Sequence, residues 1–452
     1  MKAPRVIMAA AIAAAALAFG GTNSASAAAT SFSTGFQIQN LSNATANVSI
    51  SFVPSGSATA SATVTTTIPA NGAKTYATLP ADVAAGFTGG AVINSDQQVA
   101  AVVNVLANNS FFYGEAYGGF SAGANSVTVP LLFKGSFGFN SFFNVQNTGT
   151  AATDVTVTYS GGGLSASVTE KKTVQPGSSE RFDQGTNGQL PAGFNGSAVV
   201  SSSSQPVAVA VIENGPTTLL AYNGFVGTST APVMPLINAN NSGFITGISM
   251  QNAGTQATNV TVSYTHSSAG ADCTETKAVP AGGTAFFAID AFAKDNTGET
   301  CANGATFVGS ARVTANSASQ PLIAVVNQLN QKTNKGGAYD SFDAASGTST
   351  VVFPLIQDRV AGYFTGFSIV NVGSAPVNIN CTYSNTSVTQ SISNLAPNAT
   401  WTAVQLNVIG NGYNGAGVCT ATGGTPKIVG VLNQVATSST TDAFFVSEAI
   451  NK

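Results

Sequence analysis

The sequence is poor in charged and catalytic residues. Only 7% of its 452 residues are Asp, Glu, Lys or Arg, and it contains one histidine and one tryptophan. A nucleic-acid interface needs clustered Lys and Arg, and an anionic lipid surface attracts a polybasic segment; the sequence has neither. It also lacks P-loop, HExxH and EF-hand motifs. These absences weigh against an enzyme, a nucleic-acid-binding protein and a membrane-surface protein, and we expect no cofactor.

The few ionisable residues are not arranged as a catalytic site. The single histidine, His266, follows a predicted strand in a Ser-Ser-Ala-Gly sequence, where an exposed turn residue is expected. Four acids, Glu115, Glu213, Asp340 and Glu448, lie near the ends of successive repeats. No pair of them recurs at matching positions, as a two-carboxylate hydrolase would require. We therefore predict that the protein is not an enzyme.

The chain begins with the pattern of a secretory signal. Residues 1–27 contain Lys2 and Arg5, then an apolar run at 6–19, then small residues that end at Ala27. This is typical of a signal peptide, and the run is shorter than the roughly 20 residues of a membrane-spanning helix. We expect cleavage after Ala27, a mature chain without a membrane span, and a location outside the cell or on its surface.

Copies of one segment organise the mature chain. Three copies open with Pro-Leu, at Pro130, Pro235 and Pro354, and a shortened copy without Pro-Leu begins at Gly35. Their alignment gives four units of about 100 residues, a common domain size, with no linker between them. The predicted domains are residues 28–126, 127–230, 231–350 and 351–452.

Each unit has the sequence pattern of β-structure. Apolar and polar residues alternate in segments such as 154–159, which is typical of a half-buried strand. Turn sequences rich in Asn, Pro and Gly separate these segments. About seven short strands in about 100 residues predict an immunoglobulin-like sandwich. The expected fold is all-β: four tandem immunoglobulin-like antiparallel β-sandwich domains after a signal peptide.

The four cysteines lie in the last two units. Cys381 and Cys419 replace two apolar positions of the other units, so we expect these positions to be neighbours across the core and the cysteines to be bonded. Cys301 lies in a stretch that is longer than its counterparts, where a disulfide would hold an insertion. Four cysteines allow three connectivities. Pairing within one unit favours Cys273 with Cys301 and Cys381 with Cys419. Zinc is the alternative, and neither a CxxC pair nor a nearby histidine favours it.

The Pro-Leu segment is present in three units only, so one terminal unit lacks a strand. An incomplete sandwich edge can pair with a strand of another molecule. We predict head-to-tail assembly through the chain ends. The candidate inserted strand is the start of the mature chain: Ala28, Ala29, Thr30, Ser31, Phe32 and Ser33. End-to-end docking without strand exchange is the alternative, because the chain has no spare Pro-Leu strand to donate.

Adjacent aromatic residues are candidates for contact surfaces. Pairs such as Phe142-Phe143, Phe286-Phe287 and Phe444-Phe445 send one ring to each face of a strand. Packing between units is the preferred interpretation, and subunit contact or stacking on a sugar is the alternative.

In composition and repetition the chain resembles secreted bacterial proteins built from tandem immunoglobulin-like domains, of the surface-layer, sheath, extracellular filament or adhesin type. The resemblance covers the mature chain and rests on the repeats and the low charge described above. It implies a structural protein that polymerises with itself into an extracellular filament, sheath or surface layer, with strand complementation as one route. The alternative is a monomeric adhesin or glycan-binding protein that contacts cell-surface or matrix polysaccharide.

Overall fold

The structure, a computed structural model, describes residues 29, 31–107, 113–289, 300–301, 304–330, 332–436 and 442–452. Regular structure in these residues is β-strand apart from one 3-10 helix, η1 (Ala344–Ser346). The predicted all-β class is confirmed. The predicted signal peptide lies outside the described residues. Within the described ranges, no helix has the length and hydropathy that a membrane crossing requires.

The strands fall into four consecutive groups, which we call units 1 to 4. Unit 1 contains β1 (Phe32–Asn40), β2 (Ala46–Pro54), β3 (Ala62–Ile68), β4 (Ala73–Tyr76), β5 (Gly89–Ser95), β6 (Val99–Ala107) and β7 (Gly114–Gly118). Unit 2 contains β8 (Ser126–Ser136), β9 (Phe139–Asn147), β10 (Thr153–Gly161), β11 (Val168–Val174), β12 (Ser179–Asp183), β13 (Phe194–Ser202), β14 (Val207–Asn214) and β15 (Leu219–Asn223). Unit 3 contains β16 (Pro232–Ala239), β17 (Phe244–Asn252), β18 (Thr258–Ala269), β19 (Cys273–Val279), β20 (Thr284–Phe287), β21 (Phe307–Asn316), β22 (Leu322–Asn330), β23 (Lys335–Asp340) and β24 (Phe342–Asp343). Unit 4 contains β25 (Thr350–Val360), β26 (Tyr363–Asn371), β27 (Val377–Tyr383), β28 (Thr389–Leu395), β29 (Thr400–Val404), β30 (Tyr413–Thr422), β31 (Ile428–Ala436), β32 (Phe444–Glu448) and β33 (Ile450–Asn451).

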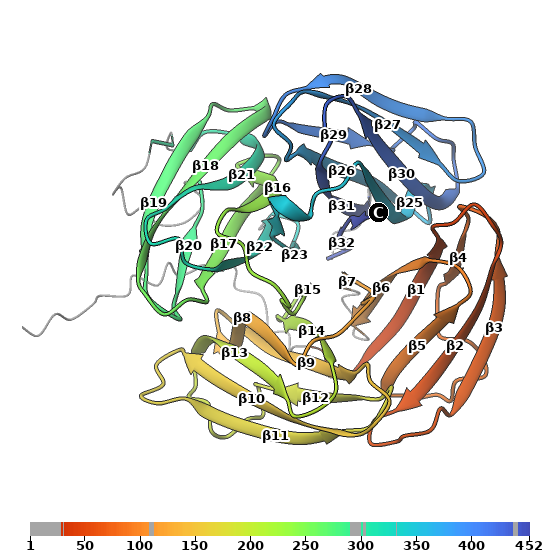
Figure 1. Cartoon of the computed structure of the whole chain (residues 1–452), viewed down its shortest axis with the longest axis vertical. Coiled ribbons are helices and arrows are strands. Elements are labelled where there is room, and N and C mark those ends of the chain that lie inside the picture. Colours follow the sequence, from red (N-terminus) through yellow and green to blue (C-terminus); the bar gives the residue numbers. More distant parts are fainter. Residues whose placement is uncertain are drawn as a thin grey trace, which may run out of the picture.

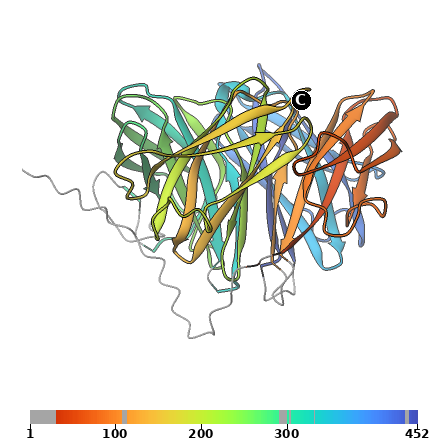
Figure 2. The same cartoon turned by 90° about the horizontal axis from the view of Figure 1, so that it is seen from below.

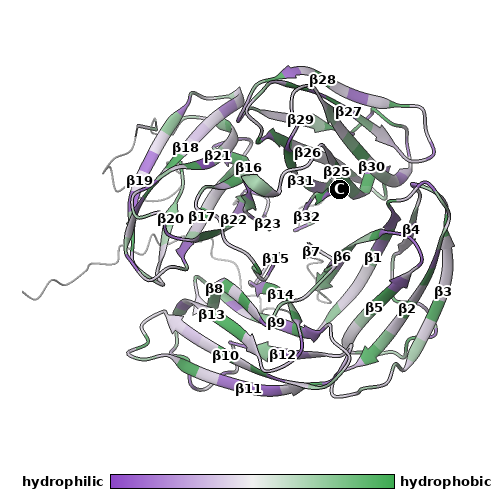
Figure 3. Cartoon of the chain, viewed as in Figure 1, coloured by the Kyte–Doolittle hydropathy of each residue, from purple (hydrophilic) through white to green (hydrophobic). Residues whose placement is uncertain are grey.

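Each unit is a sandwich of two antiparallel layers, which we call sheets; in units 2 and 4 a short pairing of β8 with β9 and of β25 with β26 connects the two layers. In unit 1 the strand orders are β3-β2-β5 and β4-β1-β6-β7; the corresponding orders in unit 2 are β11-β10-β13-β8 and β12-β9-β14-β15. We call the first the peripheral sheet and the second the axial sheet, from their places in Figure 1. The predicted alternation is present: Val155, Val157 and Tyr159 of β10 are fully buried, whereas Thr156 and Thr158 between them are partly exposed. In Figure 3, hydrophilic stretches lie on peripheral strands such as β11 and β19.

The four units close into a ring. They follow one another in chain order around a centre, where the short strands β7, β15, β23 and β32 lie, one from each unit (Figure 1). Unit 4 therefore lies against unit 1, and Leu41, Ala100 and Val352 form an apolar cluster between them. Figure 2 shows the ring from the side as a flat body whose strands cross its thickness. The two terminal units are thus neighbours rather than free ends.

The Pro-Leu segments form β8, β16 and β25, which occupy the same place in units 2, 3 and 4. Each pairs with the last strand of the peripheral sheet, β13, β21 or β30, and contacts the axial sheet of the next unit in the ring. In unit 1 the peripheral sheet ends at β5, with no such strand among its described residues. In the described part of the unit that lacks the Pro-Leu sequence, this strand is therefore also absent.

Candidate functional site: the axis of the ring

The structure contains two disulfides, Cys273–Cys301 and Cys381–Cys419. The expectation that the Cys381 and Cys419 positions face each other across the core was wrong in its geometry. The two residues are directly opposite on adjacent strands of one sheet, β27 and β30, with a Cα–Cα distance of 4.0 Å. Val157 and Val200 are paired in the same way in unit 2. Alternation identifies the side chains that face the core, but not which sheet each strand joins.

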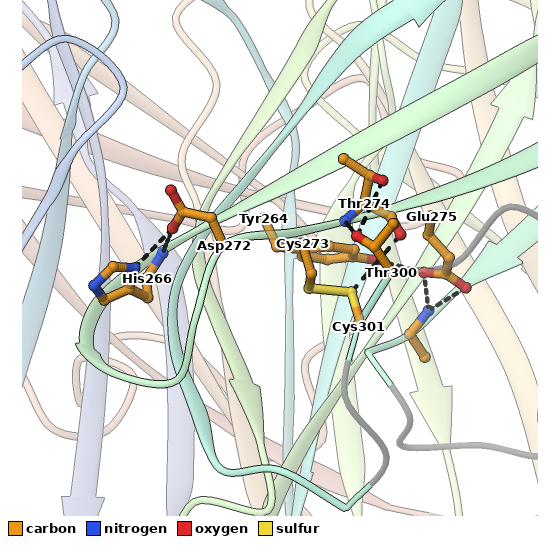
Figure 4. Close-up of a disulfide and its surroundings, with 9 residues drawn as sticks. Tyr264, His266, Asp272, Cys273, Thr274, Glu275, Thr300 and Cys301 are labelled. Carbon is orange, nitrogen blue, oxygen red and sulfur yellow. Dashed lines mark hydrogen bonds and ion pairs between the residues drawn. A yellow bond between two sulfur atoms is a disulfide. The ribbon is translucent and has the colours of Figure 1, made fainter.

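The other disulfide joins β19 to the segment before β21 (Figure 4). Beside it, the Thr300 N–H donates to the carbonyl of Thr274 at 2.9 Å, so this end of the longer stretch is held against β19. His266 lies on the extended strand β18 rather than in the predicted turn, because β18 continues to Ala269. Its Nδ1 lies 2.7 Å from Asp272 Oδ1, and both side chains are exposed.

The candidate inserted strand is used within the chain in this structure. Phe32 and Ser33 begin β1 and pair with Ala107 and Leu106 of β6 in the same unit. The Ala29 N–H donates to the Tyr113 hydroxyl at 2.8 Å, and the Asn214 amide of unit 2 donates to the Ala29 carbonyl, also at 2.8 Å. Ser31 is exposed, and residues 28 and 30 lie outside the described residues. Insertion into another subunit would require breaking these contacts, and it stays a prediction.

In two of the adjacent aromatic pairs, one ring packs against the neighbouring unit. Phe142 of unit 2 packs on Phe32 of unit 1, with ring centroids 5.2 Å apart, and Phe444 of unit 4 packs on Phe244 of unit 3 at the same distance. Phe286 differs, because 49% of its surface is exposed. The preferred interpretation, packing between units, therefore describes Phe142 and Phe444.

The residues that hold the ring together gather where the four central strands meet. Gly118, Asn223, Asp340 and Glu448 occupy equivalent positions in the four units, by the pairing of their strands. Asn223 donates its side-chain amide to the Gly118 carbonyl at 3.3 Å and its backbone N–H to Asp340. The Asp340 N–H donates to Glu448 Oε1 at 2.7 Å. Hydrogen bonds thus pass from unit 1 through units 2 and 3 to unit 4.

Asp442, just before β32, contacts all three other units. Its carboxylate accepts the N–H groups of Leu219 in unit 2 at 2.9 Å and Gly336 in unit 3 at 2.8 Å. Its backbone carbonyl accepts the N–H of Gly114 in unit 1 at 3.2 Å. These three donors hold equivalent positions at the start of the central strands. One fully buried residue of unit 4 therefore satisfies the same backbone group in each of the other units.

Two further acids are fully buried near the axis. Glu115 Oε1 of unit 1 accepts the N–H groups of Ala116 and, across the ring closure, Val446 of unit 4. Glu213 of unit 2 accepts from the Asn327 amide of unit 3 at 3.3 Å. One oxygen of each carboxyl is buried and has no hydrogen-bond partner among the described residues. An ionised carboxylate would be costly in this environment, which favours the neutral acid.

Burial shifts the pKa values of all five axial acids upward. Desolvation raises the pKa of Glu213 to about 8 and raises those of Glu115, Asp340, Asp442 and Glu448 above their usual range. Lys335, near Asp442, has its own pKa lowered by desolvation. At the axis, burial therefore favours the neutral form of carboxyl groups that accept hydrogen bonds from neighbouring units.

Four of these acids are the ones that the sequence places near the ends of successive repeats. Asp340 and Glu448 occupy equivalent positions in units 3 and 4, which is a match of single acids and not the recurring pair that a two-carboxylate hydrolase would require. The central strands of units 1 to 3 share the dipeptide Ala-Tyr, which begins at Ala116, Ala221 and Ala338. Aligning Val446-Ser447 of unit 4 with this dipeptide brings Asp340 and Glu448 to the same position. Asp442 had no repeated counterpart that could have marked it.

Comparison with known proteins identifies no family. No family model matches the chain. No curated protein matches it either. Among solved structures, a tetra-tandem repeat in the extending region of a large adhesion protein matches 91% of this chain and 93% of that chain, with 12% sequence identity and a TM-score of 0.11. A TM-score of this size carries no conclusion about fold or function.

Proposed function

We propose that this chain is a secreted, non-enzymatic structural protein that forms an extracellular filament, sheath or surface layer with copies of itself. The observation that supports this most is the use of its scarce acids. Five of the 18 Asp and Glu residues are placed at the axis, where they bind groups of neighbouring units. The scarce ionisable groups thus serve to make one rigid body of four sandwiches.

The ring alters the expected geometry of such a polymer. Units 1 and 4 contact each other, so the faces by which they would dock end to end are already covered. Contacts between rings would instead use the two flat faces or the peripheral sheets. The surface carries little charge, so neighbouring rings approach with little electrostatic repulsion.

Negative-stain electron microscopy of the mature chain at rising concentration tests this proposal. Filaments or sheets whose repeat equals one ring are expected, with no other component added. The Asp442→Ala variant is the matched control, because it weakens the ring without changing the periphery, and it should assemble poorly. Isolated rings at every concentration would contradict polymerisation.

An adhesin or glycan-binding protein is the second candidate. A shallow groove on the peripheral sheet of unit 1 is lined by hydroxyl, amide and carboxylate groups, including those of Asn47, Ser49, Thr65, Asn94 and Asp96. Such groups hydrogen-bond to sugar hydroxyls. Binding of the mature chain to matrix polysaccharide, lost in Asp96→Ala and retained in the exposed-loop variant Asp82→Ala, would favour this function over polymerisation.

A further inference from the structure

Unit 1 has an open strand position beside β5, at the place that β8, β16 and β25 fill in the other units. The core-facing residues of β5 show that this position is accessible to solvent. Ala91 is exposed, whereas its equivalents Ala198 and Ala311 are each 1% exposed. Ile93 is partly exposed, whereas its equivalent Val200 is fully buried. The strand pairings establish these equivalences, since Ala91 and Ala198 lie opposite Phe52 and Tyr159.

The backbone of β5 presents hydrogen-bonding groups toward this position. The side-chain amide of Gln146 in unit 2 donates to the Ala91 carbonyl at 3.2 Å, so this carbonyl points away from β2. In an antiparallel strand the N–H of the same residue, and both groups two residues on, point the same way. The edge at Ala91 and Ile93 can therefore pair with a further strand.

A tyrosine of the central strand marks the same position. In units 2 and 3 the hydroxyls of Tyr222 and Tyr339 bind both the N–H and the carbonyl of the leucine in the Pro-Leu strand, Leu131 and Leu236. Tyr117 is their equivalent in unit 1. Its hydroxyl has no hydrogen bond to any described residue. A strand entering unit 1 would bring a backbone to this hydroxyl.

The chain that follows the central strand borders the open position on its other side. Phe225 in unit 2 exchanges two backbone hydrogen bonds of 2.8 Å with Thr128 of β8. The corresponding chain of unit 3, β24, pairs with β16. In unit 1 the Gly119 N–H donates to the Ala101 carbonyl, as the Gly224 N–H donates to the Val209 carbonyl in unit 2. Phe120, which follows Gly119, therefore corresponds to Phe225 and lies beside the open position of unit 1.

We infer that the open position in unit 1 is a receptor for an extended segment of a different polypeptide. The three filled positions indicate the chemistry of that segment: β-branched residues at alternate places, like Val127 and Val129, followed by Pro-Leu. Both valines are fully buried in unit 2. A second copy of this chain is a poor donor, because all of its described Pro-Leu strands are buried in their own units. The inference does not depend on polymerisation and holds equally for a filament subunit or an adhesin.

A synthetic fluorescent peptide with the sequence of residues 126–133 is a suitable probe. It is expected to bind the full mature chain saturably in fluorescence anisotropy, and a peptide with both valines changed to Asp is not. Hydrogen exchange at the Ala91 and Ile93 amides is expected to slow when the peptide is bound. Absence of saturable binding, or binding equal to that of the Asp peptide, would overturn the inference.

Receptor variants show where the peptide binds. Ala91→Pro removes an edge donor at an edge strand, where proline is tolerated, and is expected to weaken binding at least tenfold. Tyr117→Phe is expected to weaken it about fivefold, the loss of one net hydrogen bond. Tyr222→Phe, the same change in the filled unit 2, should leave binding unaltered. Peptide binding that Ala91→Pro leaves unchanged would refute the site. If the chain alone forms a dimer and the peptide dissociates it, the donor of the strand is a second copy of the chain, which would overturn the inference of a different polypeptide.

Discussion

The interface between units 1 and 2 differs from that between units 3 and 4, although the same repeat forms both. Between units 3 and 4, β16 fills the edge of unit 3, and Met234 shares an apolar core with Val431 and Val446. Between units 1 and 2 no such strand is present in the described residues. An apolar cluster that includes Val105 of unit 1 and Phe142 of unit 2 joins these units, and polar groups make contacts near the edge of unit 1. Ser55, for example, donates to the Ser179 carbonyl at 2.8 Å and to Glu180 at 2.9 Å. A ring of repeats can thus close while one position stays open.

The largest expected effect is a difference in the free energy of unfolding between the same substitution made beside a filled strand position and beside the open one. Val200→Asp buries a carboxylate without a partner beside β8, and should lower the free energy of unfolding by about 4 kcal/mol or more. Ile93→Asp places the same group at the open edge, where solvent reaches it, and should cost about 1–2 kcal/mol. Urea denaturation of both variants measures the difference. Equal losses would mean that the position beside β5 is closed in solution.

The axis is common to all the interfaces, so its loss should affect them together. Asp442→Ala leaves the N–H groups of Leu219 and Gly336 buried without their acceptor. At about 1–3 kcal/mol for each of the two unsatisfied groups, the loss should be about 2–6 kcal/mol. Limited proteolysis should release separate units from this variant. Asp442→Asn retains one acceptor oxygen and should lose less; an unchanged Asp442→Ala protein would contradict the role given to this residue.

The disulfide of unit 4 can be exchanged for the apolar pair of unit 2. Either disulfide contributes about 3–4 kcal/mol in the chain-entropy model. Cys273→Ser with Cys301→Ser should lose most of that amount. Cys381→Val with Cys419→Val should lose less, because it recreates the buried Val157 and Val200 pair of unit 2. Thermal unfolding of the two double variants would show the difference, and a greater loss in the valine variant would count against the equivalence of the positions.

The most gradual effect concerns pH and the interface between units 2 and 3. The pKa of Glu213 is raised to about 8, so the folded chain holds a proton that the unfolded chain releases near pH 4.5. The free energy of unfolding should therefore fall by about 1.4 kcal/mol per pH unit as the pH rises between these values. Glu213→Gln, which copies Gln328 and Gln434 at the same place in units 3 and 4, should reduce this slope by that amount.

Denaturant titrations at pH 5, 6, 7 and 8 measure the slope. The exposed-loop variant Asp82→Asn is the control and should follow the unmodified chain. A slope that Glu213→Gln leaves unchanged would show that this carboxyl is ionised in the folded protein.

Much of the fold follows from local sequence patterns, but the axis does not. Alternation along segments such as 154–159 identifies strands, and the three Pro-Leu copies show which unit lacks one. Ring closure depends instead on single residues, Asp442 and Glu115, that have no counterpart in the other units. Their partners are backbone groups, which any sequence provides, so no side-chain pattern indicates the pairing. Likewise, the replacement of two apolar positions by Cys381 and Cys419 indicated that these positions are close together, but not that both strands belong to one sheet.

The place of Asp442 in the chain has a consequence for biogenesis. It lies within the last 11 residues, together with Glu448. A chain that is made or exported from its N-terminus can form each sandwich as it emerges, because each of the described sheets pairs strands of a single unit. The residue that joins all four units follows all the strands of units 1 to 3 and most of those of unit 4. In such a chain the ring can close only after Asp442 has emerged, and a chain truncated before Asp442 would consist of loosely connected sandwiches.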